Sequence, residues 1–461
     1  MMPFPGSLWH AGAAAVLVLI AGATVAAKAA APAAESIDVE PVWSAHPVGF
    51  SLITHKGRQF AAYYDANRRM TVAFRPLPAR KWTLHKLPRT TGWDSHNYVT
   101  MAIDGDDHIH LSGDMHCVPL FYMRTTRRLD PTSFERVANM VGPKRERRVT
   151  YPVFMRGAKG ELIFRYRDGG SGNGDDLYNV YDLKTRKWRR LMAAPLTSGQ
   201  GKMNAYCTRP ALGPDGMFHM VWVWRDTPDA ATNHHLSYAR SPDMVRWETS
   251  AGKPLKLPIT IDNADVIDPV PPRGGMINGN TRIGFDSQNR PVVTYHKYDS
   301  AGDTQVYSAR LEGGRWRIYQ TSDWKGYRWD FGGGGAIGFE VRVGGVQPAG
   351  GGRLSLGYRN KHGSGTWVLD EKTLRPVKGA AAPKGPRQAL PPAILKLESK
   401  FPGMSKRVAG DLGQVGRGGV RYVMTWESLQ PFRDRRRKGD LPKPSMLRVI
   451  KIISAGNTTQ P

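Results

Sequence analysis

The chain has 461 residues, with 66 Lys and Arg against 39 Asp and Glu, which gives a formal net charge of +27. Its hydrophobic content of 40% and aromatic content of 10% are sufficient for a buried core, which excludes a mainly disordered chain. The 51 Gly and 34 Pro follow no collagen-like period, and two cysteines are too few for a fold held together by disulfides.

The N-terminus is typical of an export signal. Residues Ala11 to Ala27 form an almost unbroken apolar stretch without charges, and Ala27-Lys28-Ala29 is a small-x-small cleavage pattern. The sequence therefore predicts a signal peptide over residues 1–29, a linker over 30–45 and an exported protein, periplasmic or secreted, that is free of the membrane after cleavage. Because the segment from Met1 to His10 has no Lys or Arg, an uncleaved anchor and a misassigned start codon remain alternatives.

Export changes how the net charge is interpreted. For an exported protein, an acidic glycan or a negatively charged cell surface is a more natural partner than nucleic acid. The basic runs Lys144–Arg148 and Arg433–Lys438 lack the interleaved aromatic residues that single-stranded nucleic acid binding uses, and we interpret them as solvated loops rather than a ligand groove. We expect no nucleic acid partner and a monomeric protein.

A weak internal repeat runs through the rest of the chain. In each unit a turn with Gly, Asp or Asn introduces an alternating strand, a second strand rich in Tyr follows, and a Trp closes the unit. The clearest units begin at Gly160, Gly216 and Asn289 and end at Trp188, Trp247 and Trp316. Fainter units begin near Phe50, Asp104, Gly352 and Gly419.

This repetition predicts an all-β fold. Seven units of about four strands, at a spacing of roughly 50 to 70 residues, favour a single-domain seven-bladed β-propeller over residues 46–455. The alternative is two β-sandwiches in tandem, with the Pro-rich segment Pro376–Pro402 as the linker between them.

Polar and aromatic residues of the types that can catalyse a reaction or bind a ligand are densest in the second and third units. His96 and His116 are expected on the first and second strands of one blade, facing the central funnel. Tyr151 and Arg167 follow in the third unit, before a Gly-rich turn, and Tyr206 and Arg225 hold similar places in the fourth. Any one of them could be a structural residue, and it is their placement at equivalent strand starts that points to a site.

Two His, two Tyr and an Arg can together perform β-elimination on a uronic acid. An Arg or a protonated His beside the carboxylate neutralises it and makes the C5 proton more acidic. A neutral His then takes that proton, and a Tyr returns one to the leaving oxygen, so no metal or other cofactor is required. Hydrolysis generally uses two flanking carboxylates, and no such Asp or Glu pair is evident.

At these residues the sequence resembles a family of BNR-repeat-like seven-bladed propeller polysaccharide lyases. The motifs are His96-Asn97, Gly113-Asp114-Met115-His116, Tyr151-Pro152, Tyr166-Arg167-Asp168-Gly169 and Asn204-Ala205-Tyr206. Three further motifs are most similar to the L-rhamnose-α-1,4-D-glucuronate lyase branch, namely Gln59-Phe60-Ala61-Ala62-Tyr63-Tyr64-Asp65, Trp93-Asp94-Ser95-His96 and Asn233-His234-His235-Leu236.

The resemblance implies roles for individual residues. It implies His96 as base and Tyr151 as acid, with the assignment between the two left open, and His116, Arg167 and Tyr206 around the uronate carboxylate. Together the catalytic prediction comprises His96, Tyr151, His116 and Arg167, and the substrate-binding prediction comprises Tyr206, Asn97, Trp93 and Arg225.

The function implied is cleavage of the α-1,4 linkage between L-rhamnose and D-glucuronate, leaving a 4,5-unsaturated uronate. Rhamnose-capped arabinogalactan, as in gum arabic, is the implied substrate. Members of the same branch are described as α-L-rhamnosidases that use a single His on the opposite face, which here matches His55. That hydrolase, an ulvan lyase and a propeller that binds acidic glycans without catalysis are the alternatives.

A structural metal ion is a further expectation from the resemblance, since some related ulvan lyases carry one. His219, His234, His235 and Cys207 could supply ligands, although they show no strict ligand spacing and can also be buried strand histidines. Cys117 and Cys207 each follow a predicted site residue, so their side chains should point away from the funnel. They form either a disulfide between neighbouring blades or two free thiols.

Overall fold

The computed structural model describes residues 33–381, 390–413 and 419–453, so the predicted signal peptide over 1–29 lies outside it. The described part is all-β, as expected. It contains one short α-helix, α1 (Pro392–Leu395), and four 3-10 turns, η1 (Ser95–Asn97), η2 (Pro131–Ser133), η3 (Pro143–Arg145) and η4 (Ala230–Thr232). Within these ranges no helix has the length and apolar character needed to cross a membrane.

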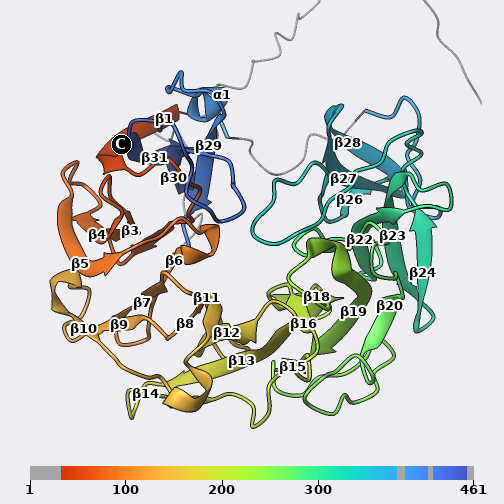
Figure 1. Cartoon of the computed structure of the whole chain (residues 1–461), viewed down its shortest axis with the longest axis horizontal. Coiled ribbons are helices and arrows are strands. Elements are labelled where there is room, and N and C mark those ends of the chain that lie inside the picture. Colours follow the sequence, from red (N-terminus) through yellow and green to blue (C-terminus); the bar gives the residue numbers. More distant parts are fainter. Residues whose placement is uncertain (1–32, 382–389, 414–418, 454–461) are drawn as a thin grey trace, which may run out of the picture.

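The described strands form seven antiparallel sheets that follow one another around a ring (Figure 1). The first sheet has β2 (Ser51–His55), β3 (Arg58–Tyr64), β4 (Arg69–Pro76) and β5 (Thr83–Thr90). The second has β6 (Val99–Ile103), β7 (Ile109–Gly113), β9 (Tyr122–Thr125) and β10 (Phe134–Arg136). The third has β8 (His116–Val118), β11 (Val149–Arg156), β12 (Leu162–Gly170), β13 (Asn173–Asp182), β14 (Lys187–Arg190) and β15 (Thr197–Ser198).

The remaining four sheets complete the ring. The fourth has β16 (Asn204–Cys207), β17 (Ala211–Leu212), β18 (Phe218–Arg225), β19 (Asn233–Ser241) and β20 (Asp265–Asp268). The fifth has β21 (Arg282–Phe285), β22 (Pro291–Tyr298), β23 (Thr304–Glu312) and β24 (Arg315–Gln320). The sixth has β25 (Arg342–Val343), β26 (Gln347–Gly350), β27 (Arg353–Asn360) and β28 (Gly363–Asp370), and the seventh has β1 (Ala33–Val42), β29 (Met404–Gly410), β30 (Val420–Leu429) and β31 (Ser445–Ile453).

The seventh sheet is built from both ends of the described chain. β1 pairs antiparallel with β31, so that Ala33 lies opposite Ile453 and Val42 opposite Ser445, and Figure 1 shows the two strands side by side. The predicted linker over 30–45 is therefore wrong for 33–42. Ile37 and Val42 are buried in this sheet, and Pro41 is accommodated because β1 is an edge strand with a bulge just before it.

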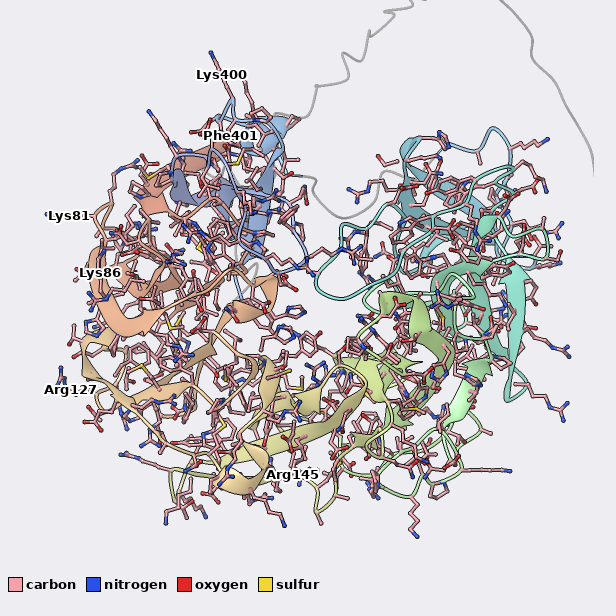
Figure 2. All side chains as sticks on the ribbon, viewed as in Figure 1. Lys81, Lys86, Arg127, Arg145, Lys400 and Phe401 are labelled. Carbon is pink, nitrogen blue, oxygen red and sulfur yellow. The ribbon has the colours of Figure 1, made fainter. Side chains whose placement is uncertain are left out.

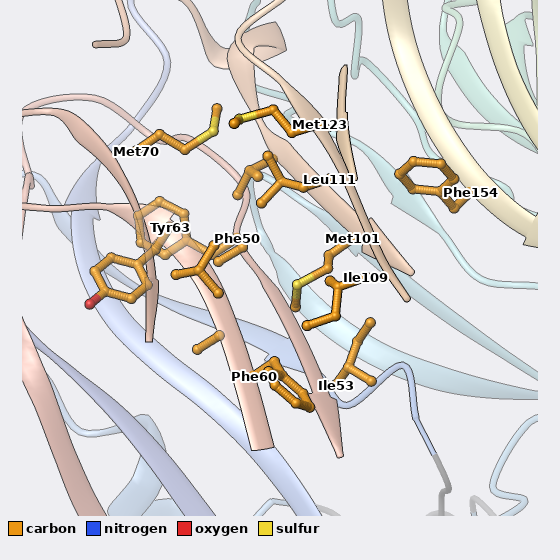
Figure 3. Packing of buried hydrophobic residues seen from close by; sticks show 14 of the residues in the cluster. Phe50, Ile53, Phe60, Tyr63, Met70, Met101, Ile109, Leu111, Met123 and Phe154 are labelled. Atoms are coloured by element: carbon orange, nitrogen blue, oxygen red, sulfur yellow. The ribbon is translucent and has the colours of Figure 1, made fainter. Parts of the chain in front are cut away.

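The hydrophobic core lies between neighbouring sheets. Ile53 and Phe60 of the first sheet pack in one buried cluster with Met101 and Ile109 of the second (Figure 3). Central strands are covered on both faces, and all eight residues of β18 are buried. This explains why β18 has a nearly continuous apolar and aromatic sequence rather than strict alternation.

Aspartates stabilise many of the turns that introduce the strands. The Oδ1 atoms of Asp65, Asp104, Asp286 and Asp299 each accept hydrogen bonds from the backbone N–H groups two and four residues later. Such side-chain-to-backbone bonds fix a tight turn ahead of the next strand. They are the physical basis of the Gly/Asp turn signal in the sequence repeat.

Positive side chains are spread over the outer rim of the ring, where Figure 2 shows Lys81, Arg127 and Lys400 projecting outward. The two basic runs are more than solvated loops. Arg145 bonds to Asp168 and Asp175, while the buried Glu146 accepts the backbone N–H groups of residues 140 and 141. The second run is also anchored, through Asp434, at the site described next.

Candidate functional site

Asp94 holds His96 and His116 together. It caps η1 by accepting the backbone N–H of His96, and its Oδ1 also lies 2.7 Å from Nδ1 of His96. Its Oδ2 lies 2.5 Å from Nδ1 of His116, and the two imidazole rings stack with centroids 4.1 Å apart. One carboxylate therefore fixes the orientation of both rings.

The protonation of this group follows from the donors and acceptors. Burial raises the pKa of Asp94, but the hydrogen bonds from His116 and His96 lower it more, so that it lies well below its usual range. An ionised carboxylate only accepts hydrogen bonds, so Nδ1 of each imidazole carries the proton in these contacts. In the neutral form of each ring the lone pair is then on Nε2, which can act as a base.

A second carboxylate, Asp434, joins three loops at the same place. Its Oδ1 accepts the N–H and hydroxyl of Ser95, its Oδ2 accepts the N–H of Ala336, and Oδ2 lies 3.5 Å from Nδ1 of His96. Arg433 beside it bonds to the carbonyls of Gly332 and Gly334. These bonds tie the loop after β30 to the loop before β25 and hold η1 in position.

Asp434 makes the protein sensitive to acid. Burial raises its pKa, but His46, whose Nε2 lies 3.7 Å from Oδ1, and the charge of His96 lower it more, to about 2. A depressed pKa stabilises the folded state above the unfolded value near 4, and this stabilisation of about 2 kcal/mol is lost as the pH falls from about 4 to 2. At pH 7 we expect the Asp434→Asn variant to melt at a lower temperature than wild type. Between pH 4 and pH 2 its melting temperature should fall less than that of wild type. The control is Asp323→Asn, because Asp323 is exposed. If the melting temperatures of wild type and both variants fall in parallel with pH, Asp434 has no such role in stability.

His96 and His116 lie in different sheets, contrary to their prediction as strands of one blade. His96 belongs to η1, ahead of β6, whereas β8 with His116 pairs with β11 of the third sheet. Cys117 has a φ of 56°, which breaks the regular alternation of side chains at this point. The two histidines therefore meet across the junction of the second and third sheets.

Tyr151 lies next to this pair at an irregularity in β11. Its φ is 59°, and the pairing with β12 shifts register between Thr150 and Val153. Its ring centroid is 5.4 Å from that of His96 and 6.2 Å from that of Tyr206. A non-glycine residue in the left-handed region carries strain that is characteristic of functional positions. Burial, and then the neighbouring Tyr206, raises the pKa of Tyr151, so its hydroxyl stays protonated at neutral pH.

Arg167 is buried beside the two tyrosines. Its guanidinium lies 4.9 Å from the ring of Tyr151 and 6.0 Å from that of Tyr206, and Nη2 donates to Thr150 Oγ1. Burial lowers the pKa of Arg167, but Tyr151 and Tyr206 raise it more, so the group stays charged. Its Nε and Nη1 are buried and have no hydrogen-bond partner among the described residues. Such unpaired charged donors are costly unless an anion binds them.

Two adjoining cavities meet at these residues. One of about 360 Å³ is lined by His96, His116, Tyr151, Tyr206 and Arg225, and we call it the histidine cavity. The other, of about 430 Å³, is lined by Arg167, Arg165 and Arg209. Both are lined by Tyr151, Tyr206, Asn278 and Gly279, so the cavities adjoin along these four residues.

The structure brings together five of the eight residues predicted for catalysis and substrate binding, namely His96, His116, Tyr151, Arg167 and Tyr206. Arg225 also lines the histidine cavity, but its Nε and Nη2 donate to the carbonyls of the loop 227–229, so it supports that loop. Asn97 is buried and its carbonyl accepts the hydroxyl of Tyr64. Trp93 packs against Trp43, with centroids 5.0 Å apart. Neither Asn97 nor Trp93 is among the lining residues of the two cavities.

His55, the alternative hydrolase residue, lines a separate cavity of about 210 Å³ together with Arg156 and Arg209. Its Nε2 lies 2.8 Å from Asp107 Oδ1, and Lys56 bonds to the same carboxylate. This cavity has no lining residue in common with the histidine cavity.

The suggested metal ligands do not form one group in the described structure, although His234 and His235 contact each other. His219 bonds to Tyr238 and Asp215, and His234 to Asp226 and His235, as satisfied strand histidines do. In the part of the chain that is described, the group whose ligand atoms lie close enough for one ion is Asp94, His96 and His116, all within 4.8 Å. Their donor atoms are already hydrogen-bonded to one another.

Both cysteines are free thiols, so the disulfide alternative is wrong. The expectation that both side chains point away from the site is also wrong, because Cys117 Sγ lies 3.4 Å from Nη2 of Arg167. Cys207 lines the cavity that contains Arg167.

Three residues of the site had no predicted role. Asp94 lies between Trp93 and His96, which were both given roles, Asp434 lies within a run noted for its positive charge, and Ser171 bonds to the hydroxyl of Tyr206. A lone acidic residue between five basic ones was the available signal for Asp434.

A family model of a BNR repeat-containing family member matches residues 58–324, more than half of the 461 residues. The chain belongs to this family. The match covers Asp94, both site histidines, Tyr151, Arg167 and Tyr206 of this BNR repeat protein. No match was found among the curated proteins.

Solved structures with a similar fold are polysaccharide lyases. The lyase Uly1 is similar with a TM-score of 0.57 and 15% identity, over 89% of this chain and 90% of that one. An ulvan lyase described as a new polysaccharide lyase family, PL25, is similar with a TM-score of 0.54 and 13% identity, over 89% and 95%. The same values apply to that enzyme bound to -[GlcA(1-4)Rha3S]-. At these identities the likeness establishes the fold of the BNR repeat protein.

Proposed function

We propose that the protein is an exported polysaccharide lyase that breaks a glycosidic bond at C4 of a uronate by β-elimination. The observation that carries this proposal is the buried Arg167, with two unpaired donors, beside Tyr151 and the histidines that Asp94 orients. We also infer that each of the seven sheets is one blade of a seven-bladed propeller, an arrangement that agrees with the fold likeness to Uly1.

The chemistry uses these groups in one sequence of bond changes. The substrate carboxylate binds Arg167, which neutralises its charge and makes the C5 proton more acidic. Nε2 of His96 takes that proton, the C4–O bond breaks, a C4–C5 double bond forms, and Tyr151 protonates the departing oxygen. The Nδ1–H bond to Asp94 supports His96 as the base, and the raised pKa of Tyr151 supports Tyr151 as the acid.

Elimination accounts for the lining residues better than hydrolysis does. Glycoside hydrolysis generally uses two carboxylates that flank the bond. Among its described lining residues the histidine cavity has no Asp or Glu, and the same holds for the cavity that contains His55. Neither cavity therefore fits a hydrolase that uses two carboxylates, whereas the rhamnosidase alternative with a single His at His55 is decided by the products of the reaction.

We propose the bond between L-rhamnose and D-glucuronate as the target, with rhamnose-capped arabinogalactan as first substrate. The sequence motifs support this choice, and the formal charge of +27 suits an anionic glycan. Ulvan is the second candidate, because the fold is similar to that of an ulvan lyase bound to a glucuronate–rhamnose sulfate unit.

The test is incubation of the purified protein with gum arabic and, separately, with ulvan. Ultraviolet absorbance of the unsaturated uronate and release of free rhamnose are measured together. We expect absorbance to rise with at least one substrate and to be unaffected by a chelator, because no step needs a metal. Rhamnose without absorbance would instead indicate a hydrolase, and binding without product would indicate a glycan-binding propeller.

Asp94→Asn tests the orientation of the histidines. An asparagine offers one oxygen acceptor in place of two, so one imidazole loses its bond from Nδ1–H and its tautomer is no longer fixed. We expect kcat to fall about 10²-fold, with a changed pH–rate profile.

The matched control is Asp215→Asn, because Asp215 holds His219 at 2.9 Å and neither residue lines the histidine cavity. Retention of the wild-type pH profile by Asp94→Asn would contradict an orienting role. So would an equal loss of kcat in Asp215→Asn.

A further inference from the structure

We propose that an arginine cluster beside the histidine cavity is a second anion-binding site, for a sulfate or carboxylate group on a sugar next to the uronate. The cluster consists of Arg282, Arg342, Arg359 and Arg407. The identity of the sugar rests on the proposed function, whereas the anion site itself does not.

The cluster lies on strands of three successive sheets. Arg282 is on β21, the edge strand of the fifth sheet, Arg342 is on β25 of the sixth, and Arg407 is on β29, the edge strand of the seventh. Arg359 is on β27, directly opposite Arg342 in the antiparallel register. Like charges in such a cross-strand pair destabilise a sheet.

These arginines lack counter-charges. None of the four forms an ion pair with any described carboxylate, although 30 ion pairs are present elsewhere in the described chain. The nearest acidic residue in sequence to Arg342 is Glu340, and its Oε1 accepts the hydroxyl of Tyr327. Arg342 and Arg359 are exposed to solvent, so an anion can reach them.

Backbone carbonyls and one aromatic ring fix the guanidinium groups. Arg282 Nη1 donates to the carbonyls of Gly279 and Thr281, and Arg359 Nη2 donates to that of Phe339. The guanidinium of Arg342 lies 4.3 Å from the ring of Phe339. Arg407 donates to Ser428 Oγ and to the carbonyl of residue 429. The cluster is therefore organised before any ligand binds, and ordering it costs little entropy on binding.

Arg342 and Arg359, paired across β25 and β27 and both in contact with Phe339, lie close enough to repel each other. The side chain of Arg342 is exposed in part, but the partial desolvation of its guanidinium lowers its pKa, and the charges of Arg359, Arg282 and Arg407 lower it further, to about 10. An anion among these groups would replace repulsion by charge-assisted hydrogen bonds. Sulfate and carboxylate match the planar donor fork of a guanidinium.

The cluster adjoins the histidine cavity through two shared residues. Gly279 and Phe339 line that cavity, and the same Gly279 and Phe339 contact Arg282, Arg342 and Arg359. A glycan with anionic groups on consecutive sugars could then place one group on Arg167 and the next on the cluster. The cluster would therefore serve ulvan, the second candidate substrate, in which anionic groups lie on consecutive sugars, rather than a single terminal uronate on arabinogalactan.

Sulfate binding tests the site without turnover. In the full chain carrying His96→Ala, we expect sodium sulfate to raise the melting temperature more than sodium chloride at equal ionic strength. The double variant Arg342→Gln/Arg359→Gln should show a clearly smaller difference, because what then remains comes from Arg167 and from the general stabilising effect of sulfate. The control Arg315→Gln/Arg317→Gln, which removes two exposed arginines of β24, should keep it. An unchanged sulfate effect in the first double variant would overturn the proposal, and so would the absence of any effect in the parent.

Substrate kinetics separate this inference from the proposed function. In the wild-type background we expect the Arg342→Gln/Arg359→Gln pair to raise the KM for ulvan about tenfold, with the β24 control unchanged. If desulfated ulvan then shows a smaller rise, sulfate is the group recognised, and an equal rise indicates a carboxylate. Sulfate binding that depends on the cluster, in a protein without lyase activity, would refute the proposed function and leave the anion site standing. If the KM of the double variant for ulvan is unchanged, the arginine cluster does not bind the substrate.

Discussion

His96→Ala is expected to lower kcat for elimination by at least about 10³-fold while the protein still folds. A positioned general base contributes roughly 10² to 10⁴ in rate, and of the two histidines that Asp94 orients we assign His96, whose ring contacts Tyr151. His96 is half-buried at a turn, outside the hydrophobic core, so its removal should change the melting temperature little. The measurement is initial rate by ultraviolet absorbance, together with a thermal melt.

The control for His96→Ala is His362→Ala, an exposed histidine in the hairpin turn between β27 and β28, which should retain wild-type rates. Added imidazole should restore part of the rate of His96→Ala, because the space left by the ring adjoins a cavity. Full elimination activity in His96→Ala would refute the assignment. Loss of activity only in His55→Ala would move the chemistry to the other cavity.

Arg167→Ala is expected to lower kcat/KM by about 10³-fold, through both a higher KM and a lower kcat. The guanidinium meets the carboxylate in the ground state, and it stabilises the charge that grows as the C5 proton leaves. Arg167→Lys keeps the charge but has different donors, and we expect it to recover only part of the loss.

Binding and catalysis can be separated for this residue. In the His96→Ala background, Arg167→Ala should weaken the binding of ulvan measured by calorimetry. The control Arg317→Ala, on the exposed face of β24, should alter neither rate nor binding. Because Arg167 is buried, folding is checked by circular dichroism. A folded Arg167→Ala protein with wild-type kcat/KM would disprove its contact with the carboxylate.

The sequence was sufficient to predict the all-β fold, and five of the residues proposed for a site lie close together in the structure. Repeated turns and strands are local signals, and each repeat start falls in a different sheet of the structure. His96, His116, Tyr151, Arg167 and Tyr206 were predicted from residue type and strand position together with the family resemblance. The structure brings these five together because η1, β8, β11, β12 and β16 lie in or ahead of consecutive sheets and meet where those sheets adjoin.

Contacts between distant segments could not be predicted in this way. Asp434 bonds to Ser95 across 339 positions, and nothing in the local run of basic residues indicates that partner. The placement of Cys117 depends on a left-handed backbone that a non-glycine sequence does not reveal. The arginine cluster likewise combines residues from three sheets, each unremarkable in its own strand.

The pairing of β1 with β31 has a consequence for how the molecule reaches its native state. Strands 33–42 and 445–453 are neighbours in space although nearly the whole described chain lies between them. During synthesis β1 must remain unpaired until β31 has emerged, and contacts of such high sequence separation slow folding. A chain that ends before β31 would leave the edges of both β1 and β30 open to association with other molecules. The pairing of β1 with β31 is therefore a late step of folding, which requires both of these strands.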